Sequence, residues 1–289
     1  MKLFFTNKVY HFLTVSRFLN TIGSSLYNIV FVIYAATVFH SKIMVGVANV
    51  TMVIPALSFM LSALVILIIK DDADYDVLSS DNELSFKEQF SNLYHNVMLI
   101  FNETNSADFI HLLLAILCLN MLSGSLNAIY NIWLLLAKIG HLSYSQALLL
   151  IEFILVGGIL IGSLTPHDYF SQKSIRQLLK ISAVIFFIVG LSNLIHFPLI
   201  IGILLLAFAS YLVGKVNPKI NSQLLSNLLA NTLAQTNSFL TFLFTLSLPV
   251  GTVLFSSLSS WNITSTWITF LALAIAIFKL SASTKTVAD

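Results

Sequence analysis

The stretch that decides the fold is residues 143–163, SYSQALLLIEFILVGGILIGS, which is long enough and apolar enough to cross a bilayer. Glu152 lies in its middle and is the only acidic residue that we place inside a membrane span. An ionisable side chain at this depth is costly, so it marks a functional site by default. Gly158 and Gly162 follow on one helix face, where two missing side chains let a neighbouring backbone pack closely.

The composition of the 289-residue chain indicates a polytopic helical membrane protein, because 57% of its residues are hydrophobic and only 9% are charged. The apolar runs are about twenty residues long, which favours helices over the shorter alternating strands of a membrane barrel. The net charge of +2 gives no reason to expect a nucleic-acid partner. We therefore expect an all-α fold with the lipid bilayer as its surroundings.

About eight transmembrane helices are predicted from the apolar runs. They cover approximately residues 12–39, 44–69, 109–136, 143–163, 178–195, 197–214, 238–258 and 263–280. Asn217 and Pro218 are expected to end the sixth helix. Pro55 in the second span, and Pro249 with Gly251 in the seventh, predict either kinks that let helices pack or gating hinges.

Residues 70–108 form the longest hydrophilic segment and begin with an acidic run. Between residues 86 and 100, apolar residues recur at spacings of three and four, which predicts an amphipathic helix on the membrane surface. The segment is too short for a catalytic domain and is interpreted as an acidic cytoplasmic linker. It separates a two-helix bundle (1–69) from a six-helix bundle (109–282), which a short tail (283–289) follows.

The distribution of the fourteen Lys and Arg residues predicts the orientation of the chain. With eight spans, twelve of them fall on the side of the N-terminus, and only Lys42 and Lys138 fall on the other side. Positive charge gathers on the cytoplasmic side of membrane proteins. Both termini are therefore expected to be cytoplasmic in a multi-pass protein of the cell membrane.

Two spans carry polar stripes at helical spacing, which predict the walls of a substrate path. The stripes consist of Arg17, Asn20 and Asn28 in the first span and of Asn120, Asn127 and Asn131 in the third. Structural hydrogen bonds between helices are the alternative interpretation of the asparagines. Arg17 lies near a helix end, so its long side chain could instead extend to the membrane surface.

Glu152 is the candidate proton-coupling or cation-binding carboxylate of the chain. The alternatives are a protonated acid that hydrogen-bonds to a neighbouring helix, or a side chain that faces an aqueous vestibule. The seven histidines have no metal-binding spacing, and no phosphate-binding glycine loop occurs, so we expect no metal, no cofactor and no ATP-driven mechanism. Glu152 has no catalytic partner on its own helix, and the chain is not expected to be an enzyme.

Five short stretches, taken in order, carry a family resemblance. They are SRFLNTIG at residues 16–23, Ile54-Pro55, the Gly158-to-Gly162 segment with its polar loop and Lys173, Asn217-Pro218-Lys219, and Pro249-Val250-Gly251. Together they resemble the major facilitator superfamily, in particular its bacterial drug- and macrolide-efflux permeases. That family has two halves of six helices, joined by a long cytoplasmic linker.

The resemblance implies that residues 109–282 form a complete second half and that the first half is truncated. The basic loop that follows the family's second helix is absent, and about four helices of the first half are missing. The resemblance further implies a bacterial plasma-membrane permease that exports a small amphipathic compound, such as a drug, in exchange for protons. A homodimer could supply the wall that a two-helix half lacks. The alternative is a non-transporting remnant, or a membrane scaffold that packs against a partner.

Overall fold

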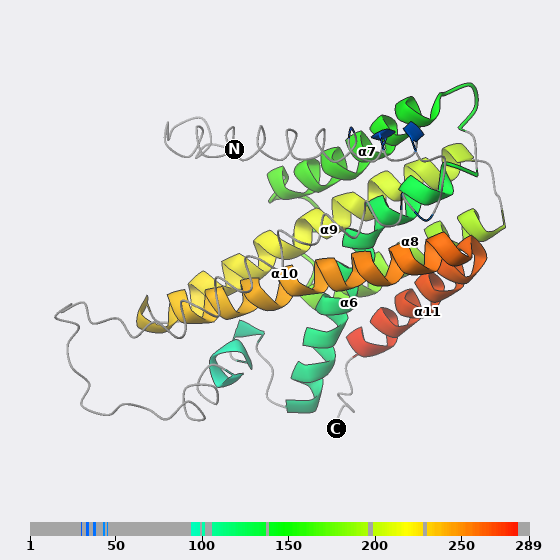
Figure 1. Cartoon of the computed structure of the whole chain (residues 1–289). Coiled ribbons are helices and arrows are strands. Elements are labelled where there is room, and N and C mark those ends of the chain that lie inside the picture. The colour runs from blue at the N-terminus through cyan, green and yellow to red at the C-terminus, as the bar shows by residue number, and fades with distance from the viewer. Residues whose placement is uncertain are drawn as a thin grey trace, which may run out of the picture.

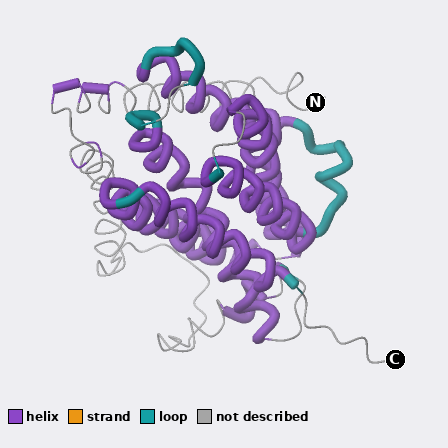
Figure 2. The backbone as a smooth tube through the Cα atoms, turned by 90° about the vertical axis from the view of Figure 1, so that its right-hand side faces the viewer, coloured by secondary structure: helices purple, strands orange, loops and turns teal. Residues whose placement is uncertain are grey.

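A computed structural model of the chain describes residues 106–136, 139–195, 199–227 and 230–282. It also describes short pieces of the preceding chain, at residues 30, 33–34, 37–38, 43, 45, 94–98 and 100–101. Within these residues every regular element is a helix, and no strand occurs (Figure 2). Most of the first two predicted spans, with Pro55, and the tail from residue 283 lie outside the described residues.

Six helices follow one another, and each is long and apolar enough to cross a membrane. They are α6 (Ser106–Trp133), α7 (Tyr144–Leu164), α8 (Ile175–Leu194), α9 (Leu199–Asn227), α10 (Ala230–Trp261) and α11 (Ile263–Ser281) (Figure 1). Each of the six spans predicted between residues 109 and 280 overlaps one of these helices. The prediction of an all-helical, multi-pass fold is confirmed for this part of the chain.

Three helix starts are fixed by side chains that bind otherwise free backbone N–H groups. The Oγ of Ser143 accepts a hydrogen bond from the N–H of Gln146 at 3.4 Å, and Gln146 Oε1 accepts one from Ser143 N–H at 2.9 Å. The same reciprocal arrangement of Ser174 and Gln177 begins α8. Asn262 caps α11 and is the single residue between α10 and α11, so the connection between these helices is very short.

The helices pack as pairs that are distant in sequence. The most extensive contacts join α7 to α9, α6 to α10, and α8 to α11. The three pairs are related by a symmetry in which α6 corresponds to α9, α7 to α10 and α8 to α11. The same correspondence relates the contact between α8 and α9 to the contact between α11 and α6. Because each unit has three helices, an odd number, the two units run in opposite directions. The pairing is therefore that of two inverted three-helix repeats.

The contact between α7 and α9 depends on glycines in both helices. A Cβ atom added to Gly162 would overlap the carbonyl oxygen of Tyr211, and one added to Gly214 would overlap that of Ile159. Gly158 lies at the same close approach, where an added Cβ would be 2.8 Å from a carbonyl oxygen of α9. The two backbones are therefore in direct contact, which a side chain at these positions would prevent.

A second close contact joins α6 and α10 in the same way. A Cβ atom on Gly251 would overlap the carbonyl oxygen of Met121, and one on Gly124 would be 2.7 Å from Leu248 Cδ2. Pro249 lies inside α10, two residues before Gly251. The glycines thus mark equivalent seams in the two symmetry-related helix pairs.

The prediction that Asn217 and Pro218 end their helix is wrong, because α9 continues through both residues to Asn227. Proline has no N–H group, so the carbonyl of Gly214 loses its donor within the helix. The Ser163 hydroxyl of α7 lies 3.2 Å from this carbonyl oxygen and 2.8 Å from the carbonyl oxygen of Ile159 in its own helix, so its single hydrogen is shared between two acceptors. A neighbouring helix therefore compensates part of the lost hydrogen bond, which helps α9 to continue inside an apolar environment.

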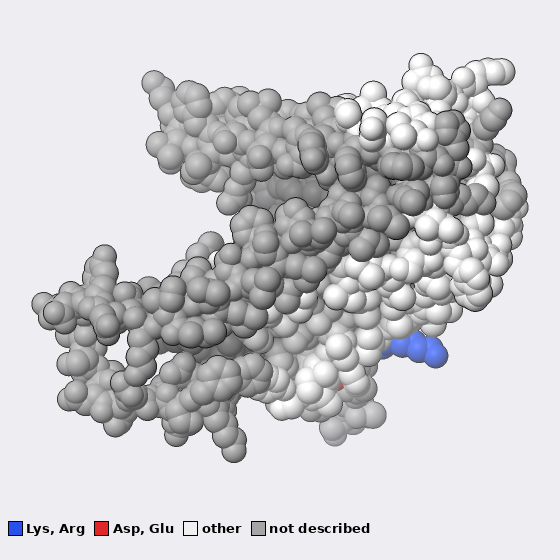
Figure 3. All heavy atoms as spheres, viewed as in Figure 1, with Lys and Arg blue, Asp and Glu red and all other residues white. Residues whose placement is uncertain are grey.

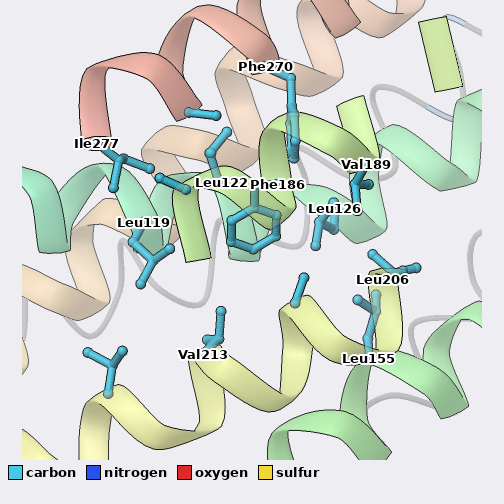
Figure 4. Packing of buried hydrophobic residues seen from close by; sticks show 14 of the residues in the cluster. Leu119, Leu122, Leu126, Leu155, Phe186, Val189, Leu206, Val213, Phe270 and Ile277 are labelled. Carbon is cyan, nitrogen blue, oxygen red and sulfur yellow. The ribbon is translucent and has the colours of Figure 1, made fainter. Parts of the chain in front are cut away.

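The centre of the bundle is apolar (Figure 4), and a cluster of aromatic side chains forms part of it. The ring of Phe270 lies 5.8 Å from that of Phe186, 6.0 Å from Phe255 and 5.6 Å from Trp267, between ring centroids. All four side chains are at most 1% exposed. Edge-to-face pairs of this kind add stabilisation beyond the burial of their area, and here they join α8, α10 and α11.

The outward faces of the helices are apolar as well. Phe153, Leu204 and Trp261 are 77%, 65% and 81% exposed. On the described part of the face in Figure 3, basic atoms lie only at the margin. Large apolar side chains exposed over so many helix turns suit a lipid environment rather than water.

The predicted linker helix is described only near its end. Residues 94–98 are helical, and the ring of Tyr94 lies 5.0 Å from that of Phe109 at the start of α6. Val97 and Ile100 have no exposed surface. These two residues of the predicted apolar face therefore pack into the protein, and the predicted location of the helix at the membrane surface stays a prediction.

We predict that Gly162→Ala destabilises the protein by about 1–3 kcal/mol, because the added methyl group forces α7 and α9 apart. The control is Gly157→Ala, since a Cβ atom at Gly157 meets nothing within 4 Å. That substitution should be neutral or stabilising by up to about 1 kcal/mol, because alanine favours a helix. Unfolding of both variants in detergent measures the difference, and equal stabilities would contradict the close contact.

Candidate functional site

A cavity of about 110 Å³ lies between α6, α7, α8 and α9. Much of its wall is apolar, and Leu126, Leu155, Phe186 and Val213 contribute to it from these four helices. In Figure 4 the four side chains face the same region of the bundle. A cavity of this size can hold water or another small ligand if polar groups also reach it.

The carboxyl group of Glu152, the candidate identified from the sequence, lies at the wall of this cavity. Glu152 lines the cavity and is half-buried, whereas the next residue, Phe153, is 77% exposed on the outer surface of α7. The cap at Ser143 and the long apolar run hold α7 as one continuous helix, which fixes the direction of each side chain. Glu152 is therefore placed inside the bundle rather than on the surface that faces lipid.

The three asparagines of the stripe predicted in α6 lie in different environments. Asn127 lines the cavity together with Glu152. Asn120 is 9% exposed and does not line it, and the backbone carbonyl of Asn131 accepts a hydrogen bond from the Tyr144 hydroxyl at 2.8 Å. Of the three asparagines, only Asn127 is brought to the candidate site.

Two serines that the sequence analysis did not select also line the cavity. Ser123 lies in α6, and its hydroxyl donates a hydrogen bond to the carbonyl oxygen of Asn120 at 3.2 Å. Ser210 lies in α9, is 3% exposed, and its hydroxyl has no hydrogen-bond partner. A serine in an apolar span has no distinctive spacing, so only the packing of α9 on α7 could identify Ser210.

The other predicted site residues are not part of this cavity. Arg17, Asn20 and Asn28 lie outside the described residues. Pro249 and Gly251 belong to the contact between α10 and α6, away from the cavity lining. The residues that the structure brings together are thus one carboxyl, one amide and two hydroxyl side chains, a set that can bind a proton, a cation or a hydrogen-bonding group.

A second polar cluster lies where α7 ends and α8 begins. In the connecting loop, Asp168 Oδ2 lies 2.7 Å from the Nζ of Lys215 in α9 and accepts a hydrogen bond from the Tyr211 hydroxyl. The Lys215 side chain is only 4% exposed and also donates to the carbonyl oxygen of Thr165. These interactions hold the loop against α9.

Further contacts order the same loop. Ser171 donates to Asp168 Oδ1 through both its N–H, at 2.8 Å, and its hydroxyl, at 2.7 Å. Lys219 Nζ of α9 donates to the carbonyl oxygen of Ser171 at 2.8 Å. The sequence analysis treated this loop only as a polar connection, because the lysines that bind it lie about fifty residues away in the chain.

The charge state of Asp168 follows from these contacts. Burial acts to raise the pKa of its carboxyl group, but hydrogen bonds from Lys215 and Ser171, together with the charge of Lys215, lower the pKa from 3.8 to about 2. The Asp168 side chain is 26% exposed, so water moderates the ion pair without removing it. At neutral pH the carboxylate is ionised and the pair is complete.

We predict that Asp168→Asn lowers the free energy of unfolding by about 3 kcal/mol, because the buried Lys215 ammonium loses its charged partner. Unfolding in detergent near neutral pH measures this effect. Lys173→Gln is the control, since the Lys173 ammonium group lies over the exposed ring of Tyr169 in the same loop, 4.2 Å from the ring centroid, and its loss should cost under about 1 kcal/mol. Equal effects of the two substitutions would contradict a structural role for the ion pair.

The low pKa of Asp168 also predicts a pH dependence of stability. A carboxyl group whose pKa is lower in the folded state stabilises it fully above the unfolded pKa, here 3.8, and this contribution is lost as the pH falls through about 2. The wild-type protein should therefore lose stability between about pH 4 and pH 2. Thermal unfolding in detergent across this range tests the prediction, and Asp168→Asn should lose less stability over the same interval.

Comparison with known proteins gives no relative for this chain: no family model, no curated protein and no solved structure matches it. The assignment of a function therefore depends on the physical chemistry of the chain's own residues. The two features that bear on it most directly are the polar groups around Glu152 and the paired, inverted arrangement of the six helices.

Proposed function

We propose that the protein is a permease of the major facilitator type, which exports a small amphipathic compound in exchange for protons. The observation that carries this proposal is the position of Glu152 on the wall of a cavity between four membrane-spanning helices. A carboxyl group within a bilayer is tolerated where other helices or water shelter it, and such groups serve as proton relays in transporters.

The composition of the cavity supports binding of an amphipathic ligand. Its apolar wall gives area for hydrophobic contact, and the side chains of Glu152, Asn127 and Ser210 offer polar contacts from three different helices. Ligand sites are commonly apolar with a few convergent polar groups. A substrate larger than this cavity would need additional volume next to it, to which the first two predicted spans, with Arg17, Asn20 and Asn28, are proposed to contribute.

The helix pairing supports the family that we propose. Transporters of the major facilitator superfamily contain inverted three-helix repeats within each six-helix half. In the same way, the helix contacts of this chain are preserved when α6, α7 and α8 are exchanged with α9, α10 and α11. Residues 109–282 are accordingly proposed to be a complete second half, and a second copy of the chain is proposed to complete the substrate path.

The distribution of basic residues supports the proposed orientation. Lys215 binds Thr165 and Lys219 binds Ser171, which places both lysines at the end of the bundle that carries the α7–α8 loop. Arg176 also lies at this end, where it donates to the carbonyl oxygen of Asp108 at 2.9 Å. We propose that this end faces the cytoplasm of a bacterial cell, because basic residues gather there.

The proposal predicts proton-driven movement of amphipathic dyes by the full chain in proteoliposomes. With a pH gradient across the membrane, wild-type protein should move ethidium or a related dye and release protons in exchange. Glu152→Gln should reduce both fluxes to the background of empty vesicles, because an amide cannot carry the proton. Dye fluorescence and a trapped pH indicator measure the two fluxes separately.

The control for this experiment is Phe153→Leu, which changes a neighbouring side chain on the outer surface of α7 and should leave both fluxes near the wild-type level. If wild-type protein moves none of a panel of amphipathic dyes, the transport proposal fails and a scaffold that moves no substrate becomes the better account. If Glu152→Gln transports as the wild type does, the carboxyl group has no role in coupling.

A further inference from the structure

The hydroxyl group of Ser210 is the strongest indication of a missing ligand in the bundle. Its side chain is 97% buried and lines the Glu152 cavity, yet its oxygen has no hydrogen-bond partner. A buried hydroxyl without a partner costs free energy, so such groups are normally satisfied by protein, water or a ligand. Because this hydroxyl belongs to a cavity wall, a ligand in the cavity is the natural partner.

Gly158 creates the space that Ser210 uses. A Cβ atom on Gly158 would lie 2.6 Å from the Cβ atom of Ser210, so a larger residue on α7 would displace the serine from its present position. The same helix carries Glu152 less than two turns earlier. The close contact of α7 and α9 therefore brings the hydroxyl group and the carboxyl group to one cavity.

The chemistry of the polar lining restricts what can bind. Glu152 offers a carboxylate, Asn127 an amide oxygen, and Ser123 and Ser210 hydroxyl oxygens, so each of the four residues can supply an oxygen ligand. Oxygen ligands without sulfur or imidazole nitrogen suit hard cations. The carboxylate disfavours an anion at the same place.

The number of charged side chains in the cavity lining narrows the choice of cation further. The described lining of the cavity contains one carboxylate. One carboxylate with neutral amide and hydroxyl oxygens is a small set of charged ligands, which suits a monovalent cation better than a divalent one. Magnesium and calcium sites usually combine several charged or water ligands in a larger shell.

We infer that this cavity is a binding site for a monovalent metal cation of the sodium type, with Glu152 as its charged ligand and Ser210 and Asn127 as neutral ligands. The inference rests on the proposed function only for the role of the site, because sodium would be a second ion that binds the carboxyl group proposed to carry the proton. Sodium and a proton would then bind to one carboxyl group in turn, which gives a chemical basis for exchange of the two ions.

The test measures sodium binding to the full chain in detergent, independently of transport. Thermal unfolding is compared in sodium chloride and in choline chloride of equal ionic strength, and equilibrium binding of radioactive sodium is measured alongside. Sodium should raise the unfolding temperature by several degrees, because a ligand that binds only the folded state stabilises it. Glu152→Gln should abolish both signals, and Ser210→Ala should weaken the sodium affinity severalfold.

Ser182→Ala is the matched control, because Ser182 in α8 is another fully buried serine without a hydrogen-bond partner but does not line the cavity. It should bind sodium as the wild type does. The inference is overturned if choline stabilises as well as sodium, if radioactive sodium does not bind the folded wild-type chain, or if Ser210→Ala and Ser182→Ala behave alike.

The outcomes separate this inference from the transport proposal. Sodium binding that requires Glu152 and Ser210, in a chain that moves no dye in vesicles, would support the cation site and end the transport proposal. Proton-driven dye movement in a chain without sodium binding would support transport and refute the cation site.

Discussion

The direct contact of two helix backbones, α7 against α9, is the constraint on which the rest of the structure depends. Gly158, Gly162 and Gly214 have no side chains to hold these helices apart, and an added Cβ atom at any of them would meet backbone. In lipid there is little hydrophobic driving force between helices, so close packing and hydrogen bonds between them carry the association. The same contact places Ser210 beside the helix that carries Glu152, so the packing of the bundle and the composition of the cavity have one cause.

The arrangement is repeated, with different residues, between α6 and α10, where Gly124 and Gly251 mark the close approach. The repeat is one of helix contacts rather than of side chains, because the cavity is lined from α6, α7, α8 and α9, whereas the aromatic cluster around Phe270 joins α8, α10 and α11. The Asp168–Lys215 ion pair likewise binds the α7–α8 loop to α9, the helix against which α7 already packs. Packing, hydrogen bonds and charge therefore all reinforce one helix pair.

The local features of this fold could be predicted from the sequence, whereas features that depend on a second helix could not. The apolar runs predict the six helices because membrane-spanning length is a property of one segment, and Glu152 is conspicuous because a carboxyl group is rare in such a run. Ser210 escaped prediction because serines are ordinary in membrane helices, and its lack of a partner is a property of the assembled bundle. The asparagine stripe of α6 was uniform in sequence, but neighbouring helices give Asn127 and Asn120 different surroundings.

The hydrogen bond from Ser163 to the carbonyl oxygen of Gly214 has a mechanical consequence. Pro218 removes one internal hydrogen bond from α9, and sharp bends of helices occur mostly at such positions. Because the compensating hydrogen bond comes from α7, a change in the curvature of α9 at this turn would change the distance between the Ser163 hydroxyl and the Gly214 carbonyl oxygen. Ser163 thus connects the turn of α9 that contains the proline to α7, the helix whose carboxyl group lines the cavity.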